Sequence, residues 1–334
     1  MNAKYYKHNL VFKQASGTSR GILTTKETFI LEIFKADKKG IGECALFRGL
    51  SYDDSPEYED KLQWLCENIN YEFEFLRKEL KEFPSLIFGL EQALLNLKNG
   101  EDLYFPSSFT EGKDAINING LIWMGNADFM QSQIEDKLKN GFHCIKLKIG
   151  VDWPSEKKIV QQLRNQFPKE KLELRVDANG AFTFEEAQTV LKELADLEIH
   201  SIEQPIKSKN IDHMAELCAN TTTPIALDEE LIGVIDFEDK KKLLEAIKPQ
   251  YIILKPALVG GFSGSDEWIS IAEKLGINWW ITSALESNIG LNAICQYTYS
   301  KQNPLPQGLG TGALFTNNFE TRLHLKGDQM WMKA

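Results

Sequence analysis

The sequence predicts a modified (β/α) barrel that follows an N-terminal α+β unit. From about residue 116, short apolar strands alternate with amphipathic segments of roughly 10–15 residues. Alternating units of this kind indicate parallel strands that are joined by helical crossovers. Eight such units over about 200 residues favour a closed barrel. A doubly wound open sheet is the alternative, but it normally carries a glycine-rich phosphate turn after its first strand, and residues 116–126 lack that fingerprint.

The first hundred residues place strands before helices. Residues 5–14 and 27–36 have the composition of strands. Residues 37–46 predict a turn, which Gly40 and Gly42 suit, and then a third strand. A meander of three antiparallel strands therefore opens the chain.

Helical spacing of apolar residues follows this meander. Two helices are predicted within residues 55–80 and 84–100. Pro84 stands where the second helix can begin, and Gly100 follows its end. We expect residues 1–112 to form one α+β domain.

The barrel domain is expected over residues 113–315. A helix within it opens at Thr183 with Glu186 three residues later, which is a capping box. Residues 316–334 look strand-like, and we expect them to return to the N-terminal domain. The predicted strands, of which the last is the least clear, are 115–120, 144–150, 172–179, 201–205, 224–229, 251–256, 278–286 and 305–312.

Composition excludes several classes of function. The chain has 334 residues and a formal net charge of −10, which argues against binding to nucleic acid or to an anionic membrane surface. No uncharged apolar run reaches the roughly 18 residues of a membrane-spanning helix, and the N-terminus turns polar too early for a secretory signal. The five cysteines are scattered without a CxxC pair, which is typical of reduced thiols in a cytoplasmic protein. The sequence leaves the oligomeric state open.

Polar residues stand at the carboxyl ends of five successive predicted strands, about one βα unit apart. That end of a barrel is where enzymes of this fold carry their chemistry. Within one barrel mouth, three carboxylates would repel one another strongly unless a hard cation lay between them, which favours Mg²⁺ with Mn²⁺ as a substitute. The carboxylates are Asp177, Glu203 and Asp228, and the lysines beside them are Lys146, Lys148 and Lys255.

Two lysines that flank a metal from opposite sides suit the removal of a proton α to a carboxylate. The pKa of a lysine near a metal and another cation should fall toward neutrality, so that the lysine can act as a base. A cation on the substrate carboxylate would stabilise the enediolate that forms. The sequence therefore predicts a small carboxylate as substrate.

Each of these residues also has a plain structural interpretation. Lys146 is as readily a salt-bridged core lysine as a functional one. Asp177 could form a turn, Glu203 could simply end a strand, and Asp228 could cap a helix. Because all of them recur at the spacing of one unit with complementary charge, we favour the functional interpretation.

The motifs "KLKIG", "RVDANGAF", "IEQP", "ALDEE" and "ILKP" resemble the barrel signature of the enolase superfamily, muconate-lactonising-enzyme subgroup. The resemblance implies a modified TIM barrel, often with its last strand replaced, and an N-terminal capping domain. It implies that Lys148 is the general acid and base and that Lys255 is the opposed lysine. It also implies that the three carboxylates bind Mg²⁺. Lys146 would be auxiliary, and Asn179 and Glu229 would support the site.

Within that subgroup, the segment "GLGTGALFTNN" is similar to the o-succinylbenzoate synthases of menaquinone biosynthesis. These lyases dehydrate 2-succinyl-6-hydroxy-2,4-cyclohexadiene-1-carboxylate. The resemblance implies a lid over residues 16–23 and contacts from Gly260, Ser283 and Ser287 to substrate carboxylates. An N-acylamino acid racemase, a dipeptide epimerase and a muconate-type cycloisomerase are the alternatives. The segment lacks the Asp-x-Asp pair with which dipeptide epimerases hold an ammonium group, which counts against that activity.

Two other classes are weighed against these enzymes. A barrel glycosidase would use paired acids without a metal and would have no use for opposed lysines, so inhibition by EDTA distinguishes the two. A binding barrel without catalysis would not require that all five polar positions be filled.

Overall fold

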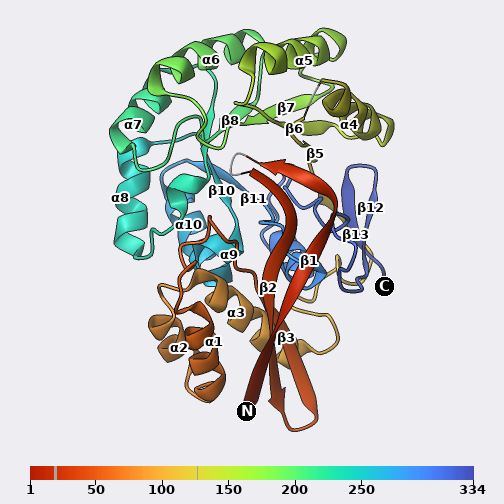
Figure 1. The fold of residues 1–334 in the computed structure, drawn as a ribbon, viewed down its shortest axis with the longest axis vertical. Helices are drawn as coiled ribbons and strands as arrows, with labels where there is room; N and C mark the ends of the chain where they lie inside the picture. The colour runs from red at the N-terminus through yellow and green to blue at the C-terminus, as the bar shows by residue number, and fades with distance from the viewer. Residues whose placement is uncertain (19–20, 126) are drawn as a thin grey trace.

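The computed structural model describes residues 1–18, 21–125 and 127–334, and it describes no side chains at residues 15–22 and 127. An antiparallel sheet with three helices lies at one end of the molecule, and a curled parallel sheet with helices around it lies at the other (Figure 1). No helix in these described ranges is long and apolar enough to cross a membrane.

The N-terminal sheet is a meander in which β2 lies between β1 and β3. Its strands are β1 (Asn2–Thr18), β2 (Gly21–Lys35) and β3 (Lys38–Cys44), and the helices that follow are α1 (Tyr58–Glu67), α2 (Phe73–Glu79) and α3 (Pro84–Asn99). The predicted start of the last helix at Pro84 is confirmed. A buried apolar cluster joins the sheet to these helices.

The prediction that Gly40 and Gly42 form the turn is wrong, because both lie within β3. They are needed for a close approach of two backbones. A Cβ atom on Gly42 would lie 2.1 Å from the carbonyl oxygen of Gly89 in α3, and one on Gly40 would lie 2.1 Å from that of Ala93. The glycines therefore let the sheet pack directly against the helix.

The parallel sheet contains seven strands in chain order, so each strand pairs with the next one along the sequence. This is the modified (β/α) barrel that the sequence predicts. The strands are β5 (Gly120–Ile122), β6 (Cys144–Lys148), β7 (Glu173–Asp177), β8 (Ser201–Glu203), β9 (Ile225–Leu227), β10 (Tyr251–Leu254) and β11 (Asn278–Ile281). The helices are α4 (Ala127–Lys139), α5 (Trp153–Gln166), α6 (Phe184–Asp196), α7 (Ile211–Asn220), η1 (Glu229–Leu231), α8 (Phe237–Ile247), α9 (Pro256–Val259), α10 (Gly261–Lys274) and α11 (Asn288–Ser300).

The gap between β5 and β11 is closed by the weakly predicted strand, residues 305–312. It forms isolated bridges rather than a ladder: Gln307 pairs with Ile118, and Gly308 pairs with Thr282. Pro306 has no N–H to donate, and a Cβ atom on Gly308 would lie 2.5 Å from the hydroxyl oxygen of Thr282. These two features explain why the segment lies in the strand position without the regular pairing of a strand.

The predicted first barrel strand, residues 115–120, is divided in the structure. Its first part is β4 (Ile116–Asn117), which pairs with a C-terminal hairpin of β12 (Leu323–Lys326) and β13 (Gln329–Met332). The barrel strand proper is β5, which begins at Gly120. Just before the hairpin, Phe315 bridges Phe12 of β1, so the C-terminal segment contacts both parts of the molecule.

Candidate active site

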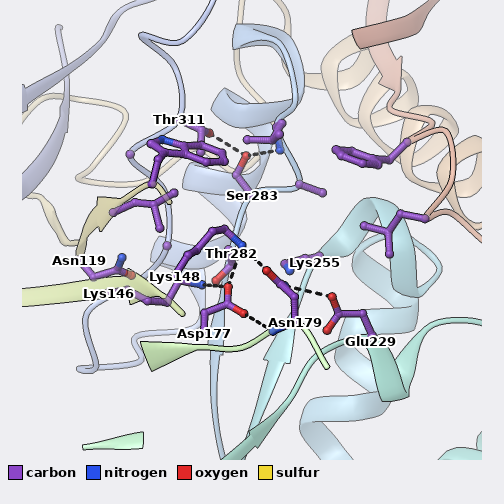
Figure 2. A pocket seen from close by; sticks show the side chains of 18 residues that line it. Asn119, Lys146, Lys148, Asp177, Asn179, Glu229, Lys255, Thr282, Ser283 and Thr311 are labelled. Carbon is purple, nitrogen blue, oxygen red and sulfur yellow. Dashed lines mark hydrogen bonds and ion pairs between the residues drawn. The ribbon is translucent and has the colours of Figure 1, made fainter. Parts of the chain in front are cut away.

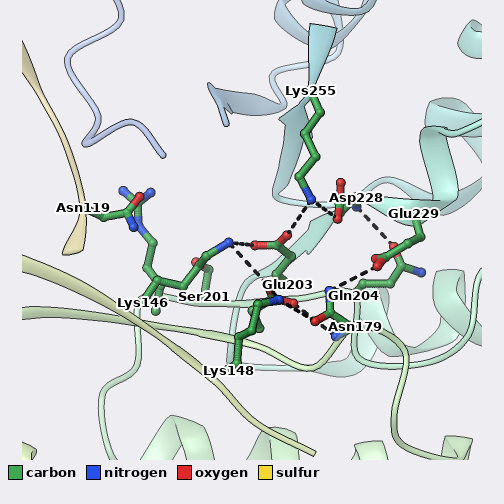
Figure 3. A network of polar contacts seen from close by, with 12 residues as sticks. Asn119, Lys146, Lys148, Asn179, Ser201, Glu203, Gln204, Asp228, Glu229 and Lys255 are labelled. Carbon is green, nitrogen blue, oxygen red and sulfur yellow. Dashed lines mark hydrogen bonds and ion pairs between the residues drawn. The ribbon is translucent and has the colours of Figure 1, made fainter. Parts of the chain in front are cut away.

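The register of the parallel sheet brings the predicted site residues together. Lys148, Asp177 and Glu203 are Cα partners across β6, β7 and β8. Asp228 follows β9, and Lys255 follows β10. All five therefore lie at the carboxyl ends of neighbouring strands. Their side chains converge, as Figure 2 shows for Asp177 and Lys148 and Figure 3 for Lys148, Glu203, Asp228 and Lys255.

The three lysines bind the three carboxylates directly. The Lys146 ammonium donates to Glu203 at 2.6 Å and to Asp177 at 3.3 Å, and Lys148 donates to Asp177 at 3.1 Å. Lys255 donates to Asp228 and lies 3.6 Å from the second oxygen of Glu203. Asp177, Glu203 and Asp228 are each at most 2% exposed. The lysines and carboxylates therefore form one continuous buried network.

The carboxylates hold the protons on two of the lysines. Burial alone would lower the pKa of Lys146, but the charges of Glu203 and Asp177 outweigh burial and raise it. In the same way, Asp228 and Glu203 raise the pKa of Lys255 above its ordinary value. Burial favours the protonated form of Asp177, yet the charge of Lys148 and that of Lys146 keep its pKa below the ordinary range. The fall in lysine pKa that the sequence predicts therefore depends on a cation that neutralises the carboxylates.

The residues fit a hard divalent cation, although the side chains are not yet arranged around one. Among residues 1–18, 21–125 and 127–334, no group of three or more potential ligands surrounds a common point. The donor set is nevertheless three buried carboxylates on adjacent strand ends, and oxygen is the ligand that Mg²⁺ requires. Within the part of the chain that the structure describes, one buried oxygen of Glu203, Oε1, has no hydrogen-bond partner and lies 3.6 Å from the Lys255 ammonium. A cation would satisfy this oxygen.

Two polar residues that the sequence places beside the three carboxylates, Asn179 and Glu229, extend the network. Asn179 accepts from Lys148 at 2.6 Å and donates to Glu229 at 3.1 Å. Its φ of 45° lies in the left-handed region, which asparagine tolerates better than most residues. Its side chain thereby links Lys148 at the end of β6 to Glu229 after β9.

Gln204 is a positioning residue that the sequence interpretation missed. Its side-chain oxygen accepts from the backbone N–H groups of Asp228 and Glu230, and its amide donates to the Glu230 carboxylate. Gln204 therefore fixes the backbone that carries Asp228. Its place directly after Glu203 in "EQP" is the signal that could have identified it.

A cavity opens above the network and is lined by both parts of the chain (Figure 2). Its floor contains all three lysines, Asp177, Asn179 and Glu229, as the sequence predicts for a mouth of this kind. The largely apolar wall above this floor was not predicted, since its residues do not recur at a regular spacing in the sequence. The other lining residues are Phe47, Leu50, Asn119, Leu121, Trp123, Thr282, Ser283, Ala284, Leu285, Gly308, Gly310 and Thr311.

The three residues that are predicted to contact substrate carboxylates lie in different places. Ser283 lines the cavity, but its hydroxyl donates to Glu286 at 2.5 Å and is not aimed at a ligand. Ser287 lies outside the cavity lining, where it caps α11 and donates to Glu43 at 2.5 Å. Gly260 lies at a second hollow between α2 and α8. Neither Ser287 nor Gly260 is therefore placed to hold a ligand in this cavity.

The predicted lid, residues 16–23, includes residues 19–20, which lie outside the described residues. The described backbone on either side belongs to the β1–β2 hairpin, in which Thr18 pairs with Gly21. This prediction therefore stays a prediction.

Comparison with known proteins gives matches over the whole chain. An o-succinylbenzoate synthase from Desulfotalea psychrophila is 44% identical, with 98% of each chain covered. The crystal structure of MenC from the same organism has a TM-score of 0.89 at 41% identity and 99% coverage of both chains. An N-succinylamino acid racemase from Thermus thermophilus is 34% identical over 82% of this chain and 75% of that protein.

A dipeptide epimerase from Enterococcus faecalis, solved with Mg and a dipeptide, has a TM-score of 0.86 with 100% of this chain and 96% of that chain covered. At 19% identity, this likeness shows the fold alone. The model of the family described as "Enolase C-terminal domain-like" matches residues 130–329, which include every proposed metal ligand and all three lysines. With a family match over more than half of its length and relatives that align from end to end, this chain belongs to the enolase superfamily.

Proposed function

We propose that this enzyme is an o-succinylbenzoate synthase, a hydro-lyase that converts 2-succinyl-6-hydroxy-2,4-cyclohexadiene-1-carboxylate to 2-succinylbenzoate. The observation that carries the proposal is the 44% identity to such an enzyme over 98% of both chains. The opposed lysines above three buried carboxylates supply the chemistry that this dehydration requires. The proposal places the enzyme in the cytoplasm and in menaquinone biosynthesis.

Lys148 is the proposed acid and base. It lines the cavity, and its hydrogen bonds to Asp177 and Asn179 hold the amine at a fixed point of the floor. A neutral Lys148 amine would take the proton α to the ring carboxylate, and the resulting ammonium would return it to the departing hydroxide as water. The proton that Lys148 takes from the substrate is the one that it gives to the hydroxide, so Lys148 ends the reaction in the form in which it began.

Lys255 is the proposed charge stabiliser. It reaches the cavity from the opposite side, and the neighbouring carboxylates raise its pKa, so that it stays an ammonium. A fixed positive charge suits an enediolate that develops negative charge during the reaction. Lys146, which is buried between Glu203 and Asp177, would tune the site through its charge.

Asp177, Glu203 and Asp228 are the proposed ligands of Mg²⁺, for which Mn²⁺ can substitute. When bound, the cation would hold the substrate carboxylate and stabilise the charge that forms on it.

The test is a direct assay of the purified protein with the cyclohexadiene carboxylate and Mg²⁺. We expect formation of the aromatic product, loss of the activity in EDTA and recovery with Mg²⁺ or Mn²⁺. Failure to form product with added metal, by a protein that is folded by circular dichroism, would overturn the proposal. A barrel glycosidase would in contrast be insensitive to EDTA.

Racemisation of N-succinylamino acids is the second candidate, because the relative from Thermus thermophilus carries that name at 34% identity. Both reactions begin with loss of a proton α to a carboxylate and could use the same lysines. Deuterium exchange at Cα of an N-succinylamino acid measures this activity. A value of kcat/KM above that for the dehydration would make racemisation the main function.

A further inference from the structure

The segment that closes the barrel, residues 305–312, also forms part of the cavity wall. Its backbone is joined to the strand positions on either side. The N–H of Gln307 donates to the Asn117 carbonyl at 2.8 Å, and the N–H of Gly308 donates to the Ile281 carbonyl at 2.8 Å. The residues of the segment that line the cavity are Gly308, Gly310 and Thr311. The position of this segment therefore helps to determine the shape of the cavity.

A buried arginine reaches the closing segment from β7. Arg175 lies two residues before Asp177 on that strand, so both side chains point to the inside of the barrel. Its Nη1 atom donates to the Pro306 carbonyl at 2.9 Å. Because the closing segment lies between β5 and β11, this hydrogen bond crosses the barrel interior.

Two further contacts fix the orientation of the Arg175 guanidinium. Its Nε atom donates to Oε1 of Glu173 at 2.7 Å, on the same strand. Its Cζ atom lies 4.3 Å from the ring centroid of Trp280 on β11, which is a cation–π contact. The carboxylate and the indole ring together aim the guanidinium at the closing segment.

This arrangement costs more than a packed core requires. Arg175 is 1% exposed, and a guanidinium keeps its charge at any physiological pH. In the described ranges of the chain, its Nη2 atom is buried without a hydrogen-bond partner. A buried cation with an unsatisfied donor is unfavourable, and an apolar side chain would fill the same space at lower cost. The bond from Arg175 to Pro306 therefore has a role besides packing.

We propose that Arg175 is a positioning residue that acts through Pro306. It holds the closing segment in place relative to β7, and so fixes the wall that this segment supplies relative to the floor at Asp177. Arg175 lies below the floor and works without contact with the substrate. The identity of the substrate rests on the function proposed above.

The first measurement is hydrogen–deuterium exchange of the wild type and of Arg175→Lys. A lysine keeps the charge, but its single ammonium group cannot bind Glu173 and Pro306 in the fork geometry of a guanidinium. We expect the Gln307 and Gly308 amides to exchange about tenfold faster in the variant, the equivalent of one hydrogen bond. Amides of β8 and β9 should exchange as in the wild type.

The second measurement is steady-state kinetics of the same two proteins. KM for the cyclohexadiene carboxylate should rise about tenfold in Arg175→Lys, because the wall no longer keeps its place. The values of kcat and of Mg²⁺ affinity should change by less than about twofold, since the lysines and carboxylates of the floor keep their own contacts. A purely structural role would not separate KM from kcat in this way.

Arg164→Lys is the matched control, because Arg164 also donates to backbone carbonyls but lies on α5, outside the barrel interior. Its acceptors are the carbonyls of Leu197, Phe167, Leu172 and Glu198. The control should lower stability without changing KM or the exchange of residues 305–312. Equal changes in Arg164→Lys and Arg175→Lys, wild-type exchange in Arg175→Lys, or a loss confined to kcat would overturn the proposal.

Two provisions keep the test decisive. If Arg175→Lys does not fold, Glu173→Ala, which removes the acceptor of Nε, takes its place, and unchanged exchange at Gln307 and Gly308 in that variant would overturn the proposal. Exchange needs no substrate, so failure of the wild type to dehydrate the cyclohexadiene carboxylate would refute the proposed function alone. Faster exchange with an unchanged KM in an active enzyme would refute the positioning role alone.

Discussion

The floor and the junction-side wall of the cavity are built in different ways. The floor residues all lie at the carboxyl ends of parallel strands: Lys146 and Lys148 at β6, Asp177 and Asn179 at β7, Glu229 after β9 and Lys255 after β10. The wall combines Phe47 and Leu50 with the loops after β5, after β11 and at 308–311. The charged residues of the floor therefore lie on regular strands, whereas the residues that give the wall its shape lie mainly on irregular loops. The repeated βα unit fixes the positions of the charged groups, and the loops can vary to suit different substrates.

The largest expected effect is on the floor, at Lys148. Lys148→Ala should lower kcat by about 10²–10⁴-fold or more, since a positioned acid and base is lost. Lys148→Arg should do no better, because a guanidinium cannot release its proton near neutral pH. The rate of dehydration under saturating Mg²⁺ measures both. A Lys148→Arg enzyme with wild-type activity would show that this lysine is structural.

Asp228→Asn is the next test of the floor. It should leave the fold intact while metal affinity falls by about 10–100-fold or more. Isothermal titration with Mg²⁺ measures the affinity, and circular dichroism checks the fold. Asp236→Asn, in the loop before α8, is the matched control. Equal affinity of the two variants would remove Asp228 from the ligand set.

Lys255→Arg separates charge from basicity. If Lys255 supplies only positive charge, the arginine should retain a measurable part of kcat, in contrast to Lys148→Arg. The comparison is made at saturating substrate and metal, so that it reports kcat alone. Equal losses in the two variants would mean that both lysines transfer protons.

For the wall, truncation should change affinity more than rate. Phe47→Ala should raise KM by roughly 10-fold, because it removes apolar contact at a position about 8% exposed, with little change in kcat. Phe75→Ala, on exposed α2, is the control. A loss confined to kcat would place Phe47 in the chemistry rather than in the wall.

The last expected effect leaves catalysis unchanged and concerns stability at the junction. Glu91 of α3 accepts from the N–H groups of Phe262 and Ser263 in α10, and burial raises its pKa to about 7. A carboxyl group with a raised folded-state pKa stabilises the fold below its unfolded pKa, and this contribution is lost as pH rises toward 7. The free energy of unfolding of Glu91→Gln, relative to that of wild type, should therefore increase as the pH rises from 4.5 to 7.5.

Urea denaturation across that range measures the change, with exposed Glu82→Gln as control. The shift from 4.5 to about 7 sets an upper limit of about 3 kcal/mol. Parallel pH profiles for Glu91→Gln and wild type would show that the pKa of this carboxyl group is the same in the folded and unfolded states.

The sequence was sufficient for the regular parts of the molecule. Strand-end polar residues at unit spacing predicted that Lys148, Asp177 and Glu203 would lie side by side, and the register confirms it. The first barrel strand was assigned too early because Ile116–Asn117 has strand composition, but it pairs with the C-terminal hairpin instead. Only the tertiary structure shows that this strand pairs with the hairpin and not with a strand of the barrel.

The wall could not be predicted for a related reason. Phe47 and Leu285 both line the cavity, yet they are 238 positions apart and neither belongs to a pattern that repeats along the chain. They share one cavity because the meander packs on the segment after β11, where Glu43 accepts from the N–H and the hydroxyl of Ser287. Likewise, Ser283 was correctly placed near the cavity, but the direction of its hydroxyl depends on Glu286, which spacing alone does not reveal.

The irregular closure of the barrel at residues 305–312 has an evolutionary consequence. Two isolated bridges hold this segment, so most of its side chains are free of the pairing demands that constrain a central strand. Gly310 therefore stands where a side chain can be added at low cost to the scaffold, since a Cβ atom there would meet no atom closer than 3.7 Å. We therefore expect changes in this short stretch to alter the choice of substrate while the lysines and carboxylates stay unchanged.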